Sequence, residues 1–193
     1  MVSSEIPPAS AKRDQLMATA WKLFYRDGYR VVGIDTLLAE AGVAKMTLYH
    51  HFASKEDLIV AVLEQQSRKL LAAVDDALDA AGRSPGRRLM AIFDGLKVWF
   101  RSDDFKGCAF IRALSEYPDP DHPIHQAAWK HKRGMNQRVR AIATDAGVKN
   151  AAALADAISL LIDGAIVAAH ATRSDAPADL ARTAAQALLK ANS

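Results

Sequence analysis

The residues best suited to hydrogen bonding are concentrated in one stretch near the N-terminus, GVAKMTLYHHFASKEDL, which runs from Gly42 to Leu58. It carries two adjacent histidines, two lysines and a tyrosine, and no Asp or Glu occurs between Ala41 and Lys55. Lys, His and Tyr donate hydrogen bonds to phosphate oxygens and base edges, whereas a carboxylate repels a polyanion. The chemistry predicted for this stretch is therefore recognition of nucleic acid.

Short helices are predicted to position these side chains. Apolar residues at helical spacing predict helices over residues 11–27, 34–41 and about 45–52, and glycines are placed to close the first two. A tight glycine turn between two short helices crosses them steeply, which is the geometry of a helix-turn-helix. The side chains expected to point inward are Leu37, Leu38, Val43, Leu48 and Phe52. Those left outward on the third helix are Lys45, Met46, Thr47, Tyr49 and His50.

The rest of the chain also has helical patterns. Ser54, with Asp57 three residues later, forms a capping box for a long helix that ends at Gly82. Further helices are predicted over about 85–101, 123–146, 151–173 and 177–190, with a kinked region between residues 101 and 123. No segment of the sequence shows the sustained period-two alternation that predicts a strand. The predicted fold class is all-α, with about nine helices.

Composition sets limits on the kind of protein. The chain has 193 residues, 50% hydrophobic and 24% charged, which suits a globular protein with one core or two domains. Its 25 basic and 22 acidic residues do not imply a partner, and the first 57 residues are neutral, with seven of each sign. Only the local distribution of charge therefore argues for nucleic acid.

The expected location is the cytoplasm. No apolar run is predicted to approach the roughly 20 residues that cross a bilayer. The start, MVSSEIPPAS, has neither a basic segment nor an apolar block. A single cysteine, Cys108, excludes an internal disulfide framework and a cluster of cysteine metal ligands.

The runs WKLFYRDGYRVVGI and TLLAEAGVAKMTLYHHFASKEDL resemble the N-terminal DNA-binding domain of the TetR family of bacterial transcriptional repressors. The resemblance covers residues 21–34 and 36–58. It implies a DNA-binding domain over residues 1–57 and a ligand-binding and dimerisation domain over 58–193. Gly33 and Ala44 depart from the family pattern, which often has Ser or Thr caps there, and Val32 replaces a commonly polar residue. The matching positions expected to contact double-stranded DNA are Lys45, Met46, Thr47, Tyr49, His50 and Lys55.

Aromatic residues are concentrated between positions 93 and 129. Plain core packing and a ligand cavity among the fifth, sixth and seventh helices are both open interpretations, because binding pockets are lined by similar residues. Similar TetR-like proteins hold a small-molecule inducer there, which here is expected to be small and largely apolar. The candidate pocket residues are Phe93, Trp99, Phe100, Phe105, Cys108, Phe110, Tyr117 and Trp129.

The predicted helix after Asn150 carries two apolar stripes on different sides. One consists of Leu154, Ile158, Leu161, Ile162 and Ala165, and the other of Ala157, Leu160, Gly164 and Ala168. Because one stripe serves the subunit core, the other needs a partner, and this predicts a homodimer that reads an inverted-repeat operator. The candidate interface residues are Ala157, Leu160, Gly164, Ala168, Leu180, Ala184 and Leu188.

No metal, cofactor or catalytic site is expected. The histidines that could suggest a metal lack a clustered carboxylate or a recognised ligand spacing; they are His122, His125, His131 and His170. Cys108 has no second cysteine to resolve an oxidised form, so a buried or pocket-lining thiol is favoured. No nucleophile with a base, phosphate loop or paired carboxylates is recognised.

The predicted function is that of a ligand-responsive regulator, a repressor that an inducer releases from its operator. The alternatives are a ligand-independent DNA-binding protein and an enzyme on a helical scaffold. One further cluster is expected to form a solvated face of the helix over 123–146: Lys130, Lys132, Arg133, Arg138 and Arg140.

Overall fold

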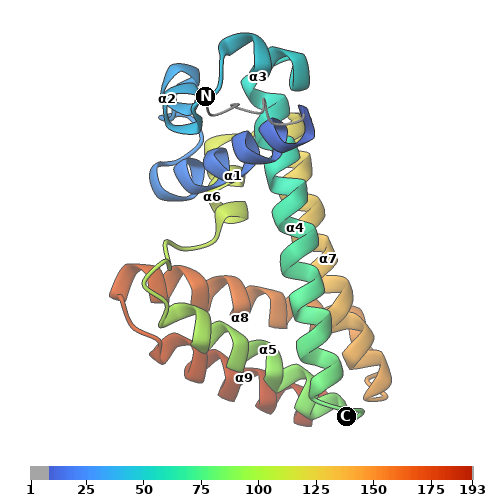
Figure 1. The fold of residues 1–193 in the computed structure, drawn as a ribbon. Coiled ribbons are helices and arrows are strands. Elements are labelled where there is room, and N and C mark those ends of the chain that lie inside the picture. Colours follow the sequence, from blue (N-terminus) through green and yellow to red (C-terminus); the bar gives the residue numbers. More distant parts are fainter. Residues whose placement is uncertain (1–8, 193) are drawn as a thin grey trace. The chain divides into compact units, whose positions relative to one another are not determined.

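The structure is a computed structural model that describes residues 9–192, and the regular structure within this range is entirely helical. The predicted all-α class is therefore confirmed for the described part of the chain. The helices are α1 (Ala9–Asp27), α2 (Ile34–Ala41), α3 (Lys45–His51), α4 (Lys55–Ala80), α5 (Pro85–Phe100), α6 (Ala109–Glu116), α7 (Pro123–Asp145), α8 (Ala151–Thr172) and α9 (Ala176–Asn192) (Figure 1). Helix α6 occupies part of the predicted kinked region, where eight residues are too few for a clear periodic pattern.

The described residues form two compact units. The N-terminal unit combines the chain up to Gln66 with residues 109–129, and the C-terminal unit combines residues 67–108 with the chain from Lys130 onward. Helices α4 and α7 each run through both units. The expected division at residue 57 is one of function and stays a prediction. The compact units divide the chain differently, because α6 and the first part of α7 pack with the N-terminal helices.

The turn between α2 and α3 is fixed by backbone geometry. Gly42 has φ 60° and ψ 34°, a left-handed conformation that glycine adopts without steric cost. The Val43 N–H donates to the Leu38 carbonyl at 3.2 Å, and Gln15 Nε2 of α1 donates to the Ala41 carbonyl at 2.9 Å. With the Gly42 N–H donating to the Ala39 carbonyl at 3.3 Å, three of the last four carbonyls of α2 are satisfied, and α1 is attached directly to this turn.

The core of the N-terminal unit is built from apolar positions spaced by one helical turn. Leu16 and Phe24 of α1 are fully buried, as are Leu37 of α2 and Leu48 of α3. Leu38 and Val43 are only half-buried. The predicted inward face is therefore confirmed at its centre, and it holds α3 against α1.

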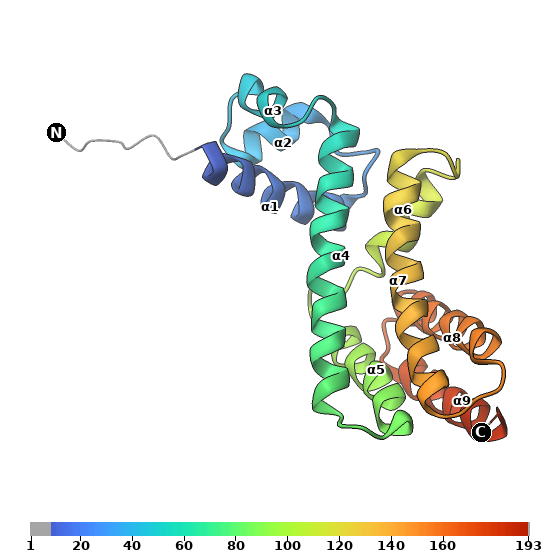
Figure 2. The same cartoon turned by 90° about the vertical axis from the view of Figure 1, so that its right-hand side faces the viewer.

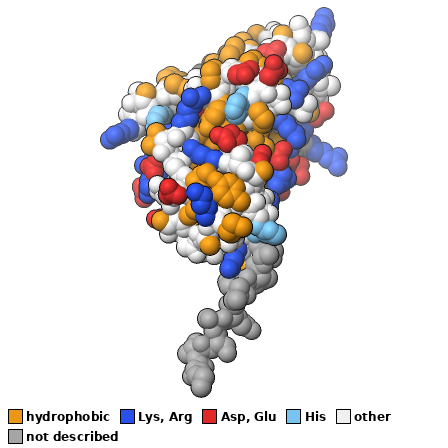
Figure 3. All heavy atoms as spheres, turned by 90° about the horizontal axis from the view of Figure 1, so that it is seen from above, with side chains coloured by type: hydrophobic (Ala, Val, Ile, Leu, Met, Phe, Trp, Pro, Cys, Tyr) orange, Lys and Arg blue, Asp and Glu red, His pale blue; other side chains and the backbone are white. Residues whose placement is uncertain are grey.

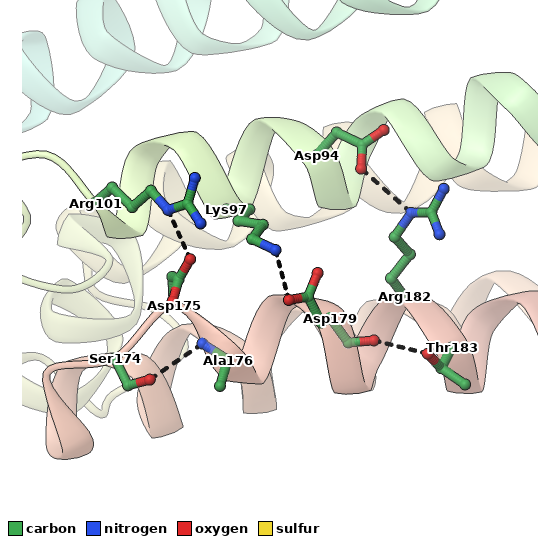
Figure 4. Close-up of polar contacts among 9 residues, drawn as sticks. All are labelled: Asp94, Lys97, Arg101, Ser174, Asp175, Ala176, Asp179, Arg182 and Thr183. Carbon is green, nitrogen blue, oxygen red and sulfur yellow. Dashed lines mark hydrogen bonds and ion pairs between the residues drawn. The ribbon is translucent and has the colours of Figure 1, made fainter.

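In the C-terminal unit, α9 lies beside both α5 and α8 (Figures 1 and 2). Oppositely charged side chains line the α5–α9 seam (Figure 4). The ion pairs are Lys97–Asp179 at 2.6 Å, Arg101–Asp175 at 2.7 Å and Arg182–Asp94 at 3.2 Å, the last without hydrogen-bond geometry at Arg182 Nε. Exposed pairs of this kind contribute only roughly 0–1 kcal/mol each to stability.

Helix α8 is mostly apolar, although Asp156 and Asp163 interrupt its apolar sequence. Within the described residues, Ala151–Thr172 is long and apolar enough to cross a membrane by length and composition only, a test that the core helix of a soluble protein also passes. Two acidic residues of this helix face α7: Asp163 pairs with Lys132, and Asp156 accepts a hydrogen bond from Asn136. The side of α8 that carries these two carboxylates therefore packs within the C-terminal unit. Apolar side chains that stay exposed lie on another side of the helix.

The expected basic face of α7 is also corrected. Lys132 forms its ion pair with α8, and Arg138 donates to Asp75 of α4 through Nε at 2.6 Å, so both side chains are mostly buried. The Arg138 guanidinium lowers the pKa of the Asp75 carboxyl below its usual value. These two cations hold α7 against its neighbours; the cations that remain exposed on α7 are Lys130, Arg133 and Arg140.

Candidate nucleic-acid interface

Helix α3 exposes most of the side chains that the sequence assigns to DNA. Met46 is 81% exposed, and Lys45, Tyr49 and His50 are also exposed, whereas Thr47 is half-buried. They occupy an amphipathic helix whose opposite face is buried. The result is a short helix with a rigid inner face and an outer face rich in hydrogen-bond donors, without a carboxylate.

The N-termini of α2 and α3 have no side-chain caps. Gly33 and Ala44 are extended at the two N-cap positions, and neither makes a side-chain capping bond. This agrees with the sequence departures noted at these positions. The first N–H groups of a helix need an external acceptor, and oxyanions such as phosphate suit this role.

Lys55, the first residue of α4, has a protein partner. Its Nζ donates to the Arg30 carbonyl at 3.3 Å, and partial burial lowers the pKa of this ammonium below its ordinary value. The ammonium has three N–H donors, so this bond leaves donors that can contact a phosphate. The capping bond predicted for α4 is confirmed, because the Asp57 N–H donates to Ser54 Oγ at 3.0 Å.

His51 is placed differently from its neighbour His50. Its ring is half-buried and makes edge contacts with the rings of His50 and Phe52, at centroid distances of 4.9 and 6.4 Å. The His51 ring therefore packs against neighbouring rings.

The surface around these residues is not uniformly basic. Figure 3 views the molecule from above and shows Lys and Arg interspersed with Asp, Glu and hydrophobic side chains. The first 57 residues have no net charge, which agrees with this mixed distribution of charges. No large field of one sign is therefore available on this surface, and the acid-free part is confined to the outer face of α3.

The eight candidate pocket residues are divided between the units. In the C-terminal unit, the Phe105 ring lies 4.9 Å from Trp99 and 5.0 Å from Phe100, and 6.2 Å from the ring of His170. Phe93, of the same unit, is fully buried, and Cys108 is half-buried. We call Trp99, Phe100 and Phe105 the aromatic cluster.

The other three candidates belong to the N-terminal unit. Phe110 is buried, Trp129 is 51% exposed, and the Tyr117 ring contacts His122 at 4.7 Å. Burial raises the pKa of the Tyr117 hydroxyl, and the nearby carboxylates of Glu56 and Glu116 add to this effect. A ligand role for these three side chains stays a prediction.

The histidines considered as metal ligands have other partners. His122 Nδ1 accepts from the Ile124 N–H at 3.2 Å, which caps α7, and His125 Nδ1 donates to the Tyr117 carbonyl at 2.8 Å. His131 is buried and hydrogen-bonds Ser67 Oγ through Nδ1 at 3.0 Å. Among the described residues, no three or more His, Cys, Asp or Glu side chains are grouped so that they could hold a metal ion.

The two stripes of α8 differ in burial. Leu154, Ile158, Ile162 and Ala165 are buried in the C-terminal unit, and Leu161 is half-buried. On the second stripe, Leu160 is 74% exposed, and a Cβ added at Gly164 would meet no atom within 4 Å. Leu180 of α9 is 73% exposed. Leu160 and Gly164 of the second stripe are therefore uncovered in the single chain, whereas Ala157 and Ala168 are half-buried.

Sequence reasoning missed two groups of polar contacts. One is the Ser67–His131 pair between α4 and α7, and the other joins Arg112 and Glu116 of α6 to the end of α1 and the turn after it. Both link residues more than 60 positions apart, so no local pattern in the sequence signals them.

A helix-turn-helix with an acid-free outer face, joined to a separate helical unit, defines a class of DNA-binding regulators. The family model for bacterial regulatory proteins, tetR family, matches residues 16–62. The model for the tetracyclin repressor-like C-terminal domain matches residues 85–185. The chain therefore belongs to the TetR family of bacterial transcriptional regulators.

Known proteins match either nearly the whole chain or about two thirds of it. The crystal structure of SCO4454, a TetR-family transcriptional regulator from Streptomyces coelicolor, is 32% identical, with a TM-score of 0.86 over 95% of this chain and 96% of that chain. The transcriptional regulator YjdC of Escherichia coli is 24% identical over 93% of this chain and 94% of its own. The transcriptional repressor NemR of Escherichia coli is 27% identical over 64% of this chain and 62% of its own.

Proposed function

We propose that this protein is a ligand-controlled repressor that binds an inverted-repeat operator as a homodimer. The observation that carries the proposal is the two-sided α3, with Lys45, Met46 and Tyr49 exposed over buried Leu48. The name of NemR as a repressor supports the direction of regulation. A repressor of this kind acts on the chromosome and is therefore placed in the cytoplasm.

The proposed roles on DNA follow from side-chain chemistry. Met46 and the Thr47 methyl group contact thymine methyl groups in the major groove, and Lys45 and His50 donate to base edges or phosphates. Tyr49 and Lys55 contact phosphates, which positions the helix without reading sequence.

The proposed dimer uses the uncovered stripe of α8 together with α9. Leu160, Gly164 and Leu180 present apolar surface that the single chain leaves exposed, and Gly164 permits close approach of a partner helix. Two copies of α8 and α9 form a four-helix bundle across a two-fold axis. A two-fold symmetric dimer then requires an operator with two inverted half-sites.

The proposed switch is the distance between the two α3 helices. Successive major-groove faces are about 34–36 Å apart, so a small movement of each reading unit reduces affinity. A small, largely apolar inducer at the aromatic cluster acts through α4, which runs without interruption from Lys55 to Ala80. A preference of about 100-fold for the displaced state, near 2.7 kcal/mol, is enough to change operator occupancy substantially.

The experiment is to sequence the DNA fragments that the purified protein retains and then titrate the recovered operator. Inverted repeats bound by a dimer support the proposal, and retention of random sequences only contradicts it. Small molecules from a panel are then screened for those that raise the melting temperature of the protein. Each of these compounds is titrated into the protein by calorimetry, with and without saturating operator. Linkage requires that saturating operator weakens inducer binding by the same factor by which the inducer weakens operator binding. A ligand-independent DNA-binding protein would give equal affinities, and an enzyme would convert the compound.

A further inference from the structure

Helix α6 belongs to the N-terminal unit, although its residues lie within the segment that matches the C-terminal family domain. Three of its residues hydrogen-bond the end of α1 and the turn that follows it. The turn leads into α2 and thus into the helix-turn-helix. We call these contacts the α6 clamp; its α6 members are Ala109, Arg112 and Glu116.

Glu116 binds two successive backbone amides. Its Oε1 accepts from the Tyr29 N–H at 3.2 Å, and its Oε2 accepts from the Arg30 N–H at 2.7 Å. Gly28, directly before them, has φ +100°, and a Cβ there would lie 2.8 Å from Glu116 Oε1. The turn therefore has both the conformation and the space that bring a carboxylate onto these amides, and hydrogen bonds to a charged acceptor are the stronger kind.

Arg112 and Ala109 bind the other side of the same turn. Arg112 Nη1 donates to the Tyr25 carbonyl at 3.0 Å, near the end of α1. The Tyr29 hydroxyl donates to the Ala109 carbonyl at 3.1 Å, and Tyr29 is fully buried. A cation thus meets the carbonyl end of α1 and an anion meets the backbone amides beyond it, which suits the helix dipole and the orphan groups.

The clamped turn also connects to a proposed DNA contact. The Arg30 carbonyl accepts from Lys55 Nζ at 3.3 Å, and the Arg30 guanidinium lies 5.0 Å from the centre of the Tyr117 ring. Arg30 is therefore held through its amide by Glu116 while its carbonyl positions Lys55.

We propose that Glu116 and Arg112 are positioning residues for DNA binding, because the α6 clamp holds the α1–α2 turn in the conformation that places α2 and Lys55 for the operator. The inference rests on the proposed DNA-binding function. When the clamp is weakened, the turn samples other conformations. The measured affinity for the operator then falls in proportion to the fraction of molecules that can still bind.

The test is operator binding by the full-length Glu116→Gln variant. A glutamine side chain has one acceptor oxygen, so its NH2 group faces one of the two amide donors and one hydrogen bond is lost. The expected result is binding about tenfold weaker, because bonds to charged acceptors are the stronger ones. The slope of log Kd against log salt stays at the wild-type value, since the phosphate contacts are unchanged.

The matched control is Glu40→Gln, which removes an exposed carboxylate from α2 of the same unit. Loss of a negative charge by itself leaves binding to a polyanion unchanged or tightens it. A simple charge effect thus predicts unchanged or tighter binding for both variants, whereas the clamp predicts weaker binding for Glu116→Gln only. Hydrogen exchange supplies a second measurement: the Tyr29 and Arg30 amides should exchange faster in Glu116→Gln while the core amides keep their protection.

Binding by Glu116→Gln that equals that of Glu40→Gln overturns the proposal. If Glu116→Gln fails to fold, Tyr29→Phe decides, since it removes one uncharged hydrogen bond to α6 and keeps the buried ring. Its expected loss is about fivefold in affinity, and wild-type affinity for this variant also overturns the proposal. If the wild-type chain binds no DNA fragment, the proposed function itself is wrong, which the wild-type titration reveals separately.

Discussion

At the scale of single residues, Lys55 is the clearest case of a side chain with two uses. It donates to the Arg30 carbonyl in the free protein, and it is proposed to donate to a phosphate on DNA. For Lys55→Ala we expect weaker binding to all sequences and a salt slope reduced by about one, because one fewer counterion is released. Titration of the isolated operator at several salt concentrations measures both effects.

The comparison variant is Met46→Ala on the exposed face of α3. Met46 is proposed to read bases, so its removal should change the preference among operator sequences and leave the salt slope as it is. Equal preferences for wild type and Met46→Ala, in a folded protein, would contradict the assignment.

His131 gives a prediction about pH. Burial lowers the pKa of His131 to about 3, and the charges of Lys132 and Arg138 add to the effect. Because the folded pKa lies below the unfolded one, the unfolded state binds more protons between the two values. Above pH ~6.5 the imidazole is neutral in both states and does not lower the free energy of unfolding. As the pH falls from there towards 3, only the unfolded state takes up the proton, so the free energy of unfolding falls.

Between pH 8 and pH 5, this group should reduce the free energy of unfolding by about 2 kcal/mol. Urea denaturation at fixed protein concentration measures the change. His131→Gln should show a smaller loss over the same range, whereas His50→Gln, at an exposed position, should follow the wild type. A His131→Gln curve parallel to that of the wild type would show that the histidine does not titrate in this range.

At the scale of helices, α4 and α7 approach closely at Gly134. A Cβ on this glycine would lie 3.0 Å from Leu71 Cδ1, closer than ordinary contact, whereas a Cβ on Gly95 of α5 would meet nothing within 4 Å. Replacing a helical glycine with alanine normally stabilises by about 1 kcal/mol. Alanine therefore brings the same gain in helix propensity at both sites, but only Gly95 has open space for the added methyl group.

We expect Gly95→Ala to stabilise by up to about 1 kcal/mol and Gly134→Ala to gain less, because Leu71 must move. Gly134→Val should destabilise, since a β-branched side chain cannot avoid the contact. Thermal melting of the three variants at one concentration measures the differences. Equal gains for the two alanine variants would show that Leu71 shifts without cost.

At the scale of the whole molecule, the main question is how the apolar surface of α8 and α9 is covered. For Gly164→Glu we expect monomers that bind the operator at least about tenfold more weakly, because a buried charge without a partner prevents close helix packing. Sedimentation at micromolar concentration and operator titration measure the two effects. A matched control is Asp76→Lys on an exposed part of α4, which should stay dimeric. A wild-type chain that sediments as a monomer would contradict the dimer.

The sequence by itself determined the all-α class, the helix-turn-helix and the two-sided character of α3 and α8. These features depend on local periodicity, glycine placement and capping residues, such as Gly42 and the Ser54 cap of α4, which act within a few residues. The helix limits follow for the same reason. Helix α6 was not delineated, because its pattern is short and its partners lie far away in the chain.

Tertiary structure alone decided which distant residues meet. It placed α6 with the N-terminal helices and brought Glu116 to the amides of Tyr29 and Arg30. It also turned Lys132 and Arg138 from an expected solvent face into contacts with α8 and α4. A charged residue on a helix looks the same in the sequence whether it faces water or a carboxylate from another helix, and only the packing of the helices chooses between the two.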